Sequence, residues 1–296
     1  MNYEGLIIRA TGGFYYVKCG SSVYECRARG IFRKDGISPL VGDLVKISLE
    51  TELGMVDEIL PRKNALVRPP LANLDRLVII SSAVEPPPDT FAIDKLIAIA
   101  EYNAIEPIIV FSKVDLSEMD MLTQLYTSAG FKTAAISSTT GEGIKEVAAM
   151  ISHPGVSAFT GNSGVGKSSL LNKILPLCLE VGVVSKKLGR GRHTTRTVEL
   201  FEISGTGGEC FVADTPGFSS LDILRAQFIS KDQLQFAFRE FAPFLDSCKY
   251  TGCAHVKETG CAVLEAVKSG EIASSRHASY CTLYDEVKDV KDWQLK

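Results

Sequence analysis

The sequence of 296 residues lacks several features that would place it in a special class. No apolar run reaches the ~18 residues that suggest a membrane-spanning helix. The start has no basic stretch followed by an apolar one, as a signal peptide has, so we expect a cytoplasmic protein without a membrane partner. The 32 Lys and Arg residues are balanced by 35 Asp and Glu. This balance excludes a strongly basic nucleic-acid binder but leaves room for a local basic patch.

Internal repeats and low-complexity tracts are also missing, and a hydrophobic content of 45% excludes extensive disorder. A chain of this length predicts two or three domains. Eight cysteines in a cytoplasmic protein are seldom a disulfide framework, so metal binding or burial is the better interpretation. Four of them fall in strand or helix patterns and are expected to be small buried apolar residues: Cys19, Cys26, Cys178 and Cys210.

Residues 1–68 predict a small β-barrel. Short segments rich in β-branched and aromatic residues are separated by turns, and they cover 5–11, 14–20, 23–29, 43–49 and 54–60. An OB-like barrel is one solution for this pattern, and an SH3-like barrel is another. A slight excess of basic residues permits nucleic-acid binding here but does not argue for it. Residues 61–73, which include Pro69 and Pro70, predict a linker.

An α/β domain is expected over residues 69–226, followed by a helical, cysteine-rich domain over 227–296. In the first of these, apolar runs typical of buried parallel strands alternate with segments of helical periodicity. The expected strands are 76–82, 107–112, 132–137, 156–160, 198–203 and 209–214. The expected helices are 91–103, 118–129, 143–151 and 168–175, and we expect Pro176 to stop the last of them.

A phosphate-binding loop follows the predicted strand 156–160. The sequence from Gly161 to Ser168 matches G-x-x-x-x-G-K-S and opens a predicted helix, which is the context that the motif requires. Lys167 is expected to reach the β- and γ-phosphates, and the Ser168 hydroxyl to ligate Mg²⁺. The expected nucleotide contacts are Gly161, Asn162, Ser163, Gly164, Val165, Gly166, Lys167, Ser168 and Ser169.

Two further loops fit a nucleotide site. Asp214-Thr-Pro-Gly217 ends a predicted strand, where the acid can hold Mg²⁺ through water and the Gly217 N–H can face the γ-phosphate. Ser112-Lys113-Val114-Asp115 ends another strand and resembles the guanine-reading N-K-x-D motif of GTPases. A carboxylate at Asp115 accepts from two guanine donors that adenine lacks, and Lys113 would lie along the base.

Two details of the base-reading loops remain open. Ser112 stands where Asn is usual, and a hydroxyl does only part of the bracing that an amide does. Ser137 and Ser138 end the next predicted strand and are candidates to donate a backbone N–H to guanine O6.

A metal site is predicted near the C-terminus by the pattern C-x₄-C-x-H-x₅-C. Three thiolates and one imidazole suit tetrahedral Zn²⁺ and leave no open position, so the site is expected to be structural. Its ligands are Cys248, Cys253, His255 and Cys261. His277 and Cys281 are spaced as rival ligands, but we interpret them as ordinary helix residues.

The segment between the phosphate loop's helix and Asp214 has the position of a GTPase switch. It holds a cluster of cations without an acid, which favours contact with RNA phosphates: Lys186, Lys187, Arg190, Arg192 and Arg196. Thr194 or Thr195 is expected to ligate Mg²⁺ in the GTP state, with a preference for Thr195.

Hydrolysis needs a positioned water, and the residue after D-x-x-G is usually a Gln. Here it is Phe218, which cannot orient water. His193 in the switch segment is the nearest suitable side chain, although a structural or RNA-binding role for it is nearly as well supported. Slow turnover and a need for an activating partner follow from this.

The order of the loops is unusual, because in ordinary GTPases the phosphate loop precedes the base-reading loop. Here Ser112–Asp115 and Ser137 come before Gly161–Ser169, so the domain is circularly permuted. With a barrel before it and a Cys/His cluster after it, the chain resembles the ribosome small-subunit-dependent GTPase A (RsgA) family. Gly191–Thr195 and Asp214–Gly217 belong to the same resemblance, which covers essentially the whole chain.

The resemblance implies an OB-fold, a permuted GTPase core and a zinc subdomain, with GTP or GDP, Mg²⁺ and Zn²⁺ as ligands. It also implies hydrolysis of GTP stimulated by the small (30S) ribosomal subunit, whose rRNA is the expected partner of a monomer. Two alternatives remain from the residues. One is a nucleotide-dependent RNA-binding assembly factor with little turnover, favoured by Phe218, and the other is a P-loop ATPase, favoured by Ser112.

Overall fold

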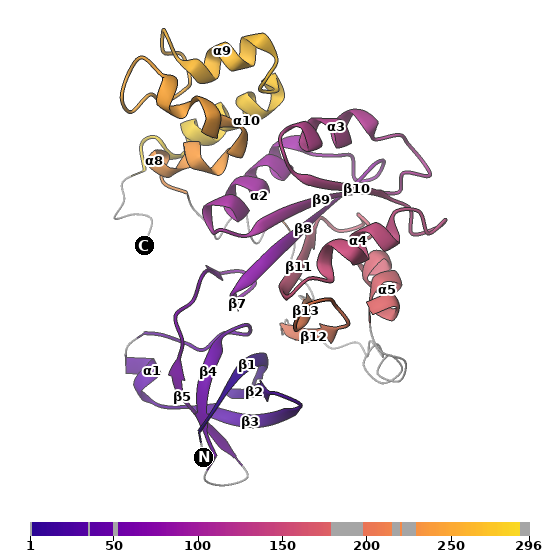
Figure 1. Ribbon diagram of the computed structural model, residues 1–296, viewed down its shortest axis with the longest axis vertical. Coiled ribbons are helices and arrows are strands. Elements are labelled where there is room, and N and C mark those ends of the chain that lie inside the picture. Colours follow the sequence, from indigo (N-terminus) through magenta and orange to yellow (C-terminus); the bar gives the residue numbers. More distant parts are fainter. Residues whose placement is uncertain are drawn as a thin grey trace.

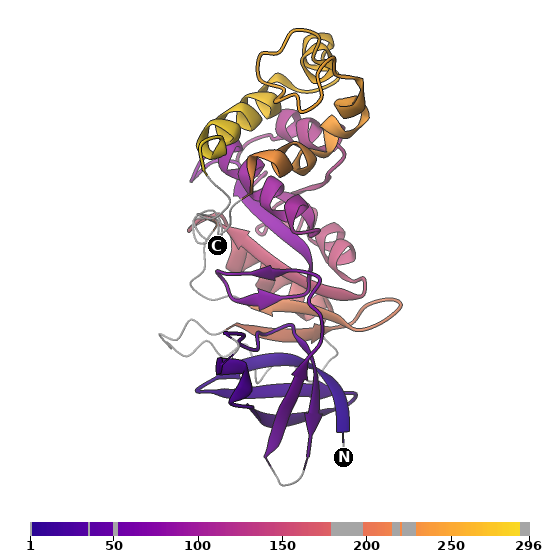
Figure 2. The ribbon, with the colours of Figure 1, turned by 90° about the vertical axis from the view of Figure 1, so that its left-hand side faces the viewer.

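The computed structural model describes residues 2–34, 36–49, 53–178, 198–214, 220 and 229–290. Figure 1 shows three bodies in a row: a small barrel at one end, an α/β body in the middle and a helical body at the other end. Figure 2 shows the same row from the side as an elongated molecule. Within the described ranges, no helix combines the length and the apolar character needed to cross a membrane.

The first body is a closed barrel. Its strands are β1 (Asn2–Thr11), β2 (Phe14–Cys19), β3 (Ser22–Ala28), β4 (Leu44–Ser48) and β5 (Gly54–Ile59). They follow the order β1-β2-β3-β5-β4, and β4 pairs again with β1, while β3 runs parallel to β5. A short helix, α1 (Ile31–Lys34), lies between β3 and β4. Alternate residues such as Val17, Val45 and Ile47 fill the interior and are fully buried. The OB-like barrel that the sequence predicts is confirmed.

The segment predicted as a linker is a structured joint. It contains the two-stranded sheet β6 (Ala65–Leu66) and β7 (Leu71–Ala72), which spans the domain boundary expected after residue 68. The Asn64 side chain bonds both the N–H and the carbonyl of Leu74 at 2.8 Å. On the barrel side, the Ala72 N–H donates to the carbonyl of Val41 at 2.9 Å. These hydrogen bonds connect the segment to the barrel on one side and to Leu74 of the middle sheet on the other. The segment is therefore structured, although its prolines predict a linker.

The middle body is a sheet with helices on both faces. Its strands are β8 (Leu74–Ser82), β9 (Glu106–Ser112), β10 (Lys132–Ile136), β11 (Gly155–Gly161), β12 (Glu199–Ile203) and β13 (Cys210–Asp214), in the order β10-β9-β8-β11-β13-β12. All neighbours are parallel except β12, which runs antiparallel to β13. The strands predicted from the sequence are confirmed with shifts of a few residues at most.

Two separate apolar layers cover this sheet. Residues of α2 (Thr90–Tyr102) and α3 (Asp120–Ser128) pack with Leu77, Ile79 and Phe111 on one face. Residues of α4 (Ile144–Ile151) and α5 (Lys167–Cys178) pack with Val78 and Ile80 on the other. The alternation along β8 is the pattern expected of a strand buried on both sides.

Helix α5 differs from the expectation at its end, since it continues through Pro176 to Cys178. A proline fits the last turn of a helix because its fixed φ is helical and only one backbone N–H is lost there. The prediction that Pro176 stops the helix is therefore wrong by about one turn.

The third body consists of short helices that lie on the α2 side of the sheet (Figure 2). They are α8 (Lys231–Leu234), the 3₁₀ helices η1 (Gln235–Ala237) and η2 (Arg239–Ser247), and the helices α9 (Ala262–Ser269) and α10 (Ser274–Val287). Phe238, Phe241 and Tyr280 are buried together, with ring centroids 4.9–5.4 Å apart. These rings belong to the same apolar cluster as α2, so the subdomain covers a face of the middle body.

The barrel is joined to the middle sheet through its first strand. β1 pairs antiparallel with β12 at Arg9 and Glu199, which makes one sheet of 11 strands. The Lys18 ammonium of β2 contacts the carboxylate of Glu209 at 2.5 Å and that of Glu202 at 3.5 Å. Backbone and side-chain contacts thus attach the barrel to the β12 edge of the middle sheet.

Candidate functional site: nucleotide loops and a metal cluster

The phosphate loop follows β11 and is shaped by glycines. A Cβ on Gly161 would lie 2.7 Å from the carbonyl oxygen of Ile80 in β8, so no larger residue fits there. Gly164 and Gly166 have φ of +84° and +92°, which side chains avoid. Lys167 opens α5, and its ammonium lies 3.5 Å from the Gly161 carbonyl. Ser168 and Ser169 are exposed in the first turn of α5, where unpaired N–H groups favour an anion.

Ser112 connects the base-reading loop to the phosphate loop. It is 2% exposed at the end of β9, and its hydroxyl donates to the carbonyl of Val165 at 2.5 Å. The Ser81 carbonyl lies 3.3 Å from the same hydroxyl. The serine at this position thus connects the two loops, although an asparagine amide is the usual brace in the N-K-x-D motif. The bond brings together two segments that are 53 positions apart in the chain.

Lys113 and Asp115 occupy different surroundings in the same loop. Lys113 has a φ of +62°, and its ammonium donates to the carbonyl of Glu85 at 2.5 Å. Asp115 is exposed, and its carboxylate makes no hydrogen bond or ion pair with any other residue in the described parts of the chain. Its lone pairs are therefore available to a ligand with two adjacent donors. Val114 ties this loop to the next one, since its N–H donates to the carbonyl of Ile136 at 3.2 Å.

The loop after β10 is closed by Ser137. The buried hydroxyl of Ser137 accepts from the N–H groups of Thr139 and Thr140 at 3.2 and 3.1 Å. The Ser137 N–H is itself engaged, because it donates to the carbonyl of Glu142 at 3.1 Å. Of the two serines that the sequence named for guanine O6, Ser137 shapes the loop, and the N–H of Ser138 makes no hydrogen bond within the described residues.

Asp214 ends β13, next to β11 and the phosphate loop. Its neighbour Ala213 pairs with Ala158, two residues before Thr160. Ser220 is buried, and its hydroxyl lies 3.4 Å from that of Thr160. Ser220, three positions after the D-x-x-G sequence, therefore lies against β11, which spacing alone does not reveal. Several predicted residues lie outside the described parts: His193, Thr194, Thr195, Gly217, Phe218, Lys186, Lys187, Arg190, Arg192 and Arg196.

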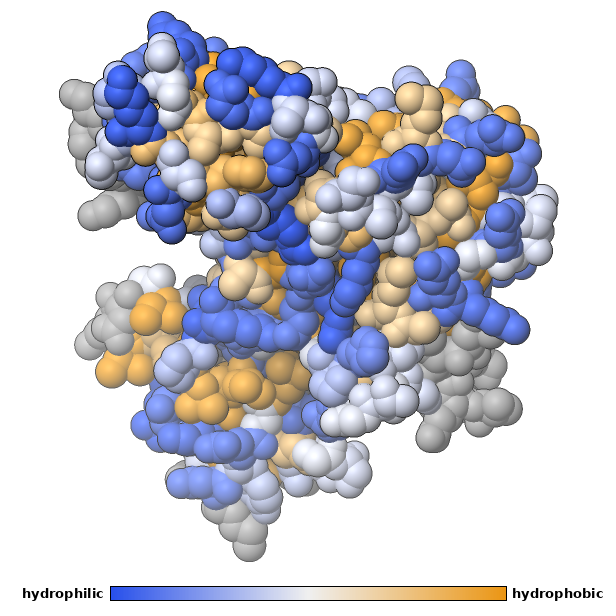
Figure 3. Space-filling model, turned by 45° about the horizontal axis from the view of Figure 1, so that its top comes forward, coloured by the Kyte–Doolittle hydropathy of each residue, from blue (hydrophilic) through white to orange (hydrophobic). Residues whose placement is uncertain are grey.

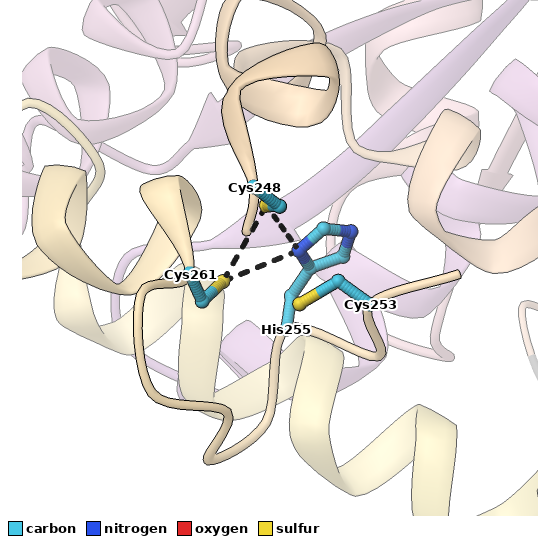
Figure 4. A group of neighbouring side chains, drawn as sticks. All are labelled: Cys248, Cys253, His255 and Cys261. Atoms are coloured by element: carbon cyan, nitrogen blue, oxygen red, sulfur yellow. Dashed lines mark hydrogen bonds between the residues drawn. The ribbon is translucent and has the colours of Figure 1, made fainter. Parts of the chain in front are cut away.

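The Cys/His cluster of the third body is assembled as the sequence predicts (Figure 4). The ligand atoms of Cys248, Cys253, His255 and Cys261 all lie within 4.8 Å of one another. The Nδ1 atom of His255 is 3.6 Å from the sulfur of Cys248 and 3.3 Å from that of Cys261, and these two sulfurs are 3.9 Å apart. Ligands around tetrahedral zinc stand about 3.5–3.8 Å apart, from Zn–S and Zn–N bonds of about 2.3 and 2.0 Å. The donor set and its spacing therefore fit Zn²⁺.

Electrostatics favour a cation at this cluster. Burial raises the pKa of the Cys253 thiol to about 12 and also raises the pKa of Cys261, so thiolates form here only when a cation compensates them. Burial lowers the pKa of His255, which keeps the imidazole neutral and able to ligate. The Nε2 atom of His255 lies 2.8 Å from the Gln235 side-chain oxygen, and this bond leaves the Nδ1 lone pair for the metal.

The remaining cysteines and histidines take the roles that the sequence predicts where they are described. His277 and Cys281 lie on α10 outside the cluster, and the Nε2 atom of His277 is bonded to the carbonyl of His255 at 2.7 Å. Cys26 and Cys210 are fully buried, and Cys19 is partly buried. The side chain of Cys178 lies outside the described part.

Known proteins with similar sequences share this combination of domains. The model of the RsgA GTPase family matches residues 59–224, and that of the RsgA N-terminal domain matches residues 4–56. A small ribosomal subunit biogenesis GTPase RsgA from Caldanaerobacter subterraneus subsp. tengcongensis is 46% identical over 99% of this chain and 98% of its own length. The protein of the same name from Ruminiclostridium cellulolyticum is 40% identical over 99% of this chain and 96% of its length.

Two solved structures agree with the fold. YjeQ from Thermotoga maritima superposes with a TM-score of 0.80 at 30% identity and covers 98% of this chain and 100% of its own. YloQ, described as a circularly permuted GTPase, gives a TM-score of 0.77 at 37% identity over 98% and 96% of the two chains. The loop order predicted from the sequence agrees with that description. The chain therefore belongs to the RsgA GTPase family, and it is a GTP hydrolase with a circularly permuted catalytic domain.

Proposed function

We propose that this GTPase acts in the biogenesis of the small ribosomal subunit and that binding to the subunit stimulates its hydrolysis of GTP to GDP and phosphate. The observation that carries the GTPase part of the proposal is the hydrogen bond from Ser112 to Val165, which unites the base-reading and phosphate loops of a permuted GTPase. The names of full-length relatives supply the biological setting. We infer three units, 1–68, 69–226 and 227–296, in a monomer that works in the cytoplasm.

The nucleotide is held by its two ends. Asp115 accepts from the guanine donors, Lys113 lies along the base, and the N–H of Ser138 would donate to O6. At the other end, the N–H groups of 161–169 surround the phosphates and Lys167 neutralises the β- and γ-phosphates. Because Ser112 fixes the spacing of the two loops, base and phosphate recognition act together.

Mg²⁺ would be held by Ser168, Thr195 and Asp214, with Thr194 as the alternative in the switch. When bound, the ion neutralises charge that develops on the phosphate oxygens. Gly217 would donate its N–H to the γ-phosphate. Phe218 cannot orient water, so His193 is assigned to accept a proton or hydrogen bond from the attacking water. Turnover is then slow until a partner binds.

The partner surface includes the barrel, the basic switch and the zinc subdomain. On the outside of the barrel the guanidinium of Arg27, an exposed residue, lies 4.7 Å from the ring centroid of Phe14. Cation and aromatic pairs of this kind stack on bases and contact phosphates. Figure 3 shows apolar patches between polar ones on the barrel, and such patches suit contact with a protein component of the partner more than with RNA phosphates. One structural Zn²⁺ at the Cys₃His cluster would keep the third body folded.

The test is the rate of single-turnover GTP hydrolysis with and without purified small ribosomal subunits. We expect slow hydrolysis alone and much faster hydrolysis with subunits, with a stimulation that falls as salt rises because phosphate contacts release counterions. A rate that subunits leave unchanged would contradict the proposed activation. Subunit binding without measurable turnover would favour an assembly factor that uses GTP only as a structural ligand.

A further inference from the structure

A buried ion network joins the zinc-binding helices to the GTPase domain. The side chains of Arg276 on α10 and Asp94 on α2 are only 1% and 2% exposed, and Nη1 of Arg276 lies 2.7 Å from the carboxylate of Asp94. The same guanidinium reaches Glu240 of η2, with Nε 2.7 Å and Nη2 3.2 Å from its oxygens. The Tyr126 hydroxyl of α3 donates to Asp94 at 3.0 Å. One guanidinium thus links the subdomain to two helices of the middle body.

The charges in this network depend on each other. Burial raises the pKa of Asp94, and the positive charge of Arg276 works against that shift. Desolvation lowers the pKa of Arg276, but Glu240 and Asp94 together raise it above its ordinary value. The rings of Phe238 and Phe131 lie 4.7 and 5.2 Å from the guanidinium and exclude water. A displacement of α10 would therefore leave buried charges unpaired, which makes the contact nearly all-or-none.

The metal loop reaches this network through α10. The Tyr280 hydroxyl donates to the carbonyl of Ala254 at 2.9 Å, and the Nε2 atom of His277 bonds the carbonyl of His255 at 2.7 Å. His277 is the direct neighbour of Arg276 on the helix. A bound Zn²⁺ that fixes His255 also fixes the loop on which α10 rests.

The nucleotide loops reach the network through α2. A small cavity is lined by residues of the first turns of α2 together with residues of the phosphate loop: Asp89, Ala92, Ile93, Leu96, Asn162 and Val165. Ser220 of the segment after D-x-x-G lines the same cavity. Ile93 precedes Asp94 directly, and the carbonyl of Val165 is the acceptor of the Ser112 hydroxyl. Helix α2 therefore lines one cavity with the phosphate loop, and the Ser112 hydroxyl ties the phosphate loop to the base-reading loop.

We propose that Asp94 and Arg276 are positioning residues that couple the zinc site to the nucleotide site, so that bound Zn²⁺ strengthens guanine-nucleotide binding and bound nucleotide slows the loss of Zn²⁺. The inference rests on the zinc and nucleotide assignments above and adds a linkage between them. At equilibrium, the factor by which bound Zn²⁺ strengthens nucleotide binding must equal the factor by which bound nucleotide strengthens Zn²⁺ binding, because coupling between two binding sites is reciprocal.

The first test uses the full-length chain and the release of Zn²⁺ to a coloured chelator, with and without saturating GDP. We expect GDP to slow the release, and we expect zinc-loaded protein to bind GDP more tightly than zinc-stripped protein, by roughly 5- to 150-fold as in typical coupled sites. Equal release rates and equal GDP affinities would overturn the inference while leaving both binding sites intact. A chain that holds no zinc would overturn the metal assignment and the coupling with it.

The second test uses Asp94→Asn, which keeps the size of the side chain and its contact with Tyr126 but removes the charge that faces Arg276. This variant is expected to bind Zn²⁺ and GDP while the protection of zinc by GDP falls toward onefold. Lys95→Met is the matched control, because it removes an exposed ion pair of 2.5 Å to Glu286 between the same two helices. Full protection in Lys95→Met with loss in Asp94→Asn supports the coupling, and equal protection in both contradicts it. If Asp94→Asn does not fold, the wild-type comparison decides the question.

Discussion

Replacing Ser112 with alanine tests whether one hydroxyl sets the spacing of the two nucleotide loops. The change removes a buried hydrogen bond of 2.5 Å and leaves the carbonyl of Val165, a residue only 2% exposed, without its donor. An unsatisfied buried carbonyl costs about 1–3 kcal/mol. If that cost falls on the arrangement that binds nucleotide, affinity weakens by about 5- to 150-fold, at about 1.4 kcal/mol for each factor of ten.

The bond lies away from the expected γ-phosphate, so the loss should be equal for GDP and for a non-hydrolysable GTP analogue. Titration with a fluorescent guanine nucleotide measures both dissociation constants. Ser112→Thr keeps the hydroxyl and should bind nearly as the wild type does. Ser157→Ala is the control for general loss of stability, because Ser157 is a fully buried serine of β11 whose side chain contacts Arg76, outside the nucleotide loops. Unchanged affinity in Ser112→Ala would refute the reasoning.

Three further changes test separate parts of the site. Asp115→Asn should shift base preference from guanine toward xanthine nucleotides, because an amide donor then meets the oxygen at position 2 of xanthine. Competition between nucleotides measures this preference. Equal competition by ATP and GTP for the wild type would contradict the assignment. Cys253→Ala should lose the single bound Zn²⁺, measured as metal content per chain, and full metal content in the variant would rule out this ligand set. His193→Ala should keep nucleotide and subunit binding, but its stimulated hydrolysis rate should fall by about 10²–10⁴-fold. This is the typical effect of removing a group that transfers a proton. Equal single-turnover rates at saturating subunits would remove His193 from catalysis.

The elements of this fold were predictable where local pattern decides them. Strands such as β8 and β9 are continuous apolar runs, and the phosphate loop carries its own glycine spacing, so both follow from the sequence alone. The metal ligands were predictable for the same reason, since all four lie within one short segment. Such a motif can be recognised from the spacing of its own residues, without knowing which distant residues it contacts.

The parts that escaped prediction depend on pairs distant in the chain. Gln235 orients His255 from 20 positions away, and Asp94 meets Arg276 across 182 positions. The prolines of the joint between barrel and sheet predict a linker because they are visible in the sequence, whereas the two bonds from Asn64 to Leu74 are not. Side-chain types indicate that such polar groups need partners, but only the fold selects which partners they find.

The continuous sheet has a consequence for the relative position of the barrel and the nucleotide loops. β1 of the barrel is hydrogen-bonded to β12, and the joint residues pin the barrel to β8 on the same body. The barrel is thus attached to the catalytic body at two places, so a change in their separation would break bonds at both. If the barrel binds the small subunit as proposed above, the subunit meets the nucleotide loops at one set distance, and a subunit whose two contact regions are spaced differently would not bind both.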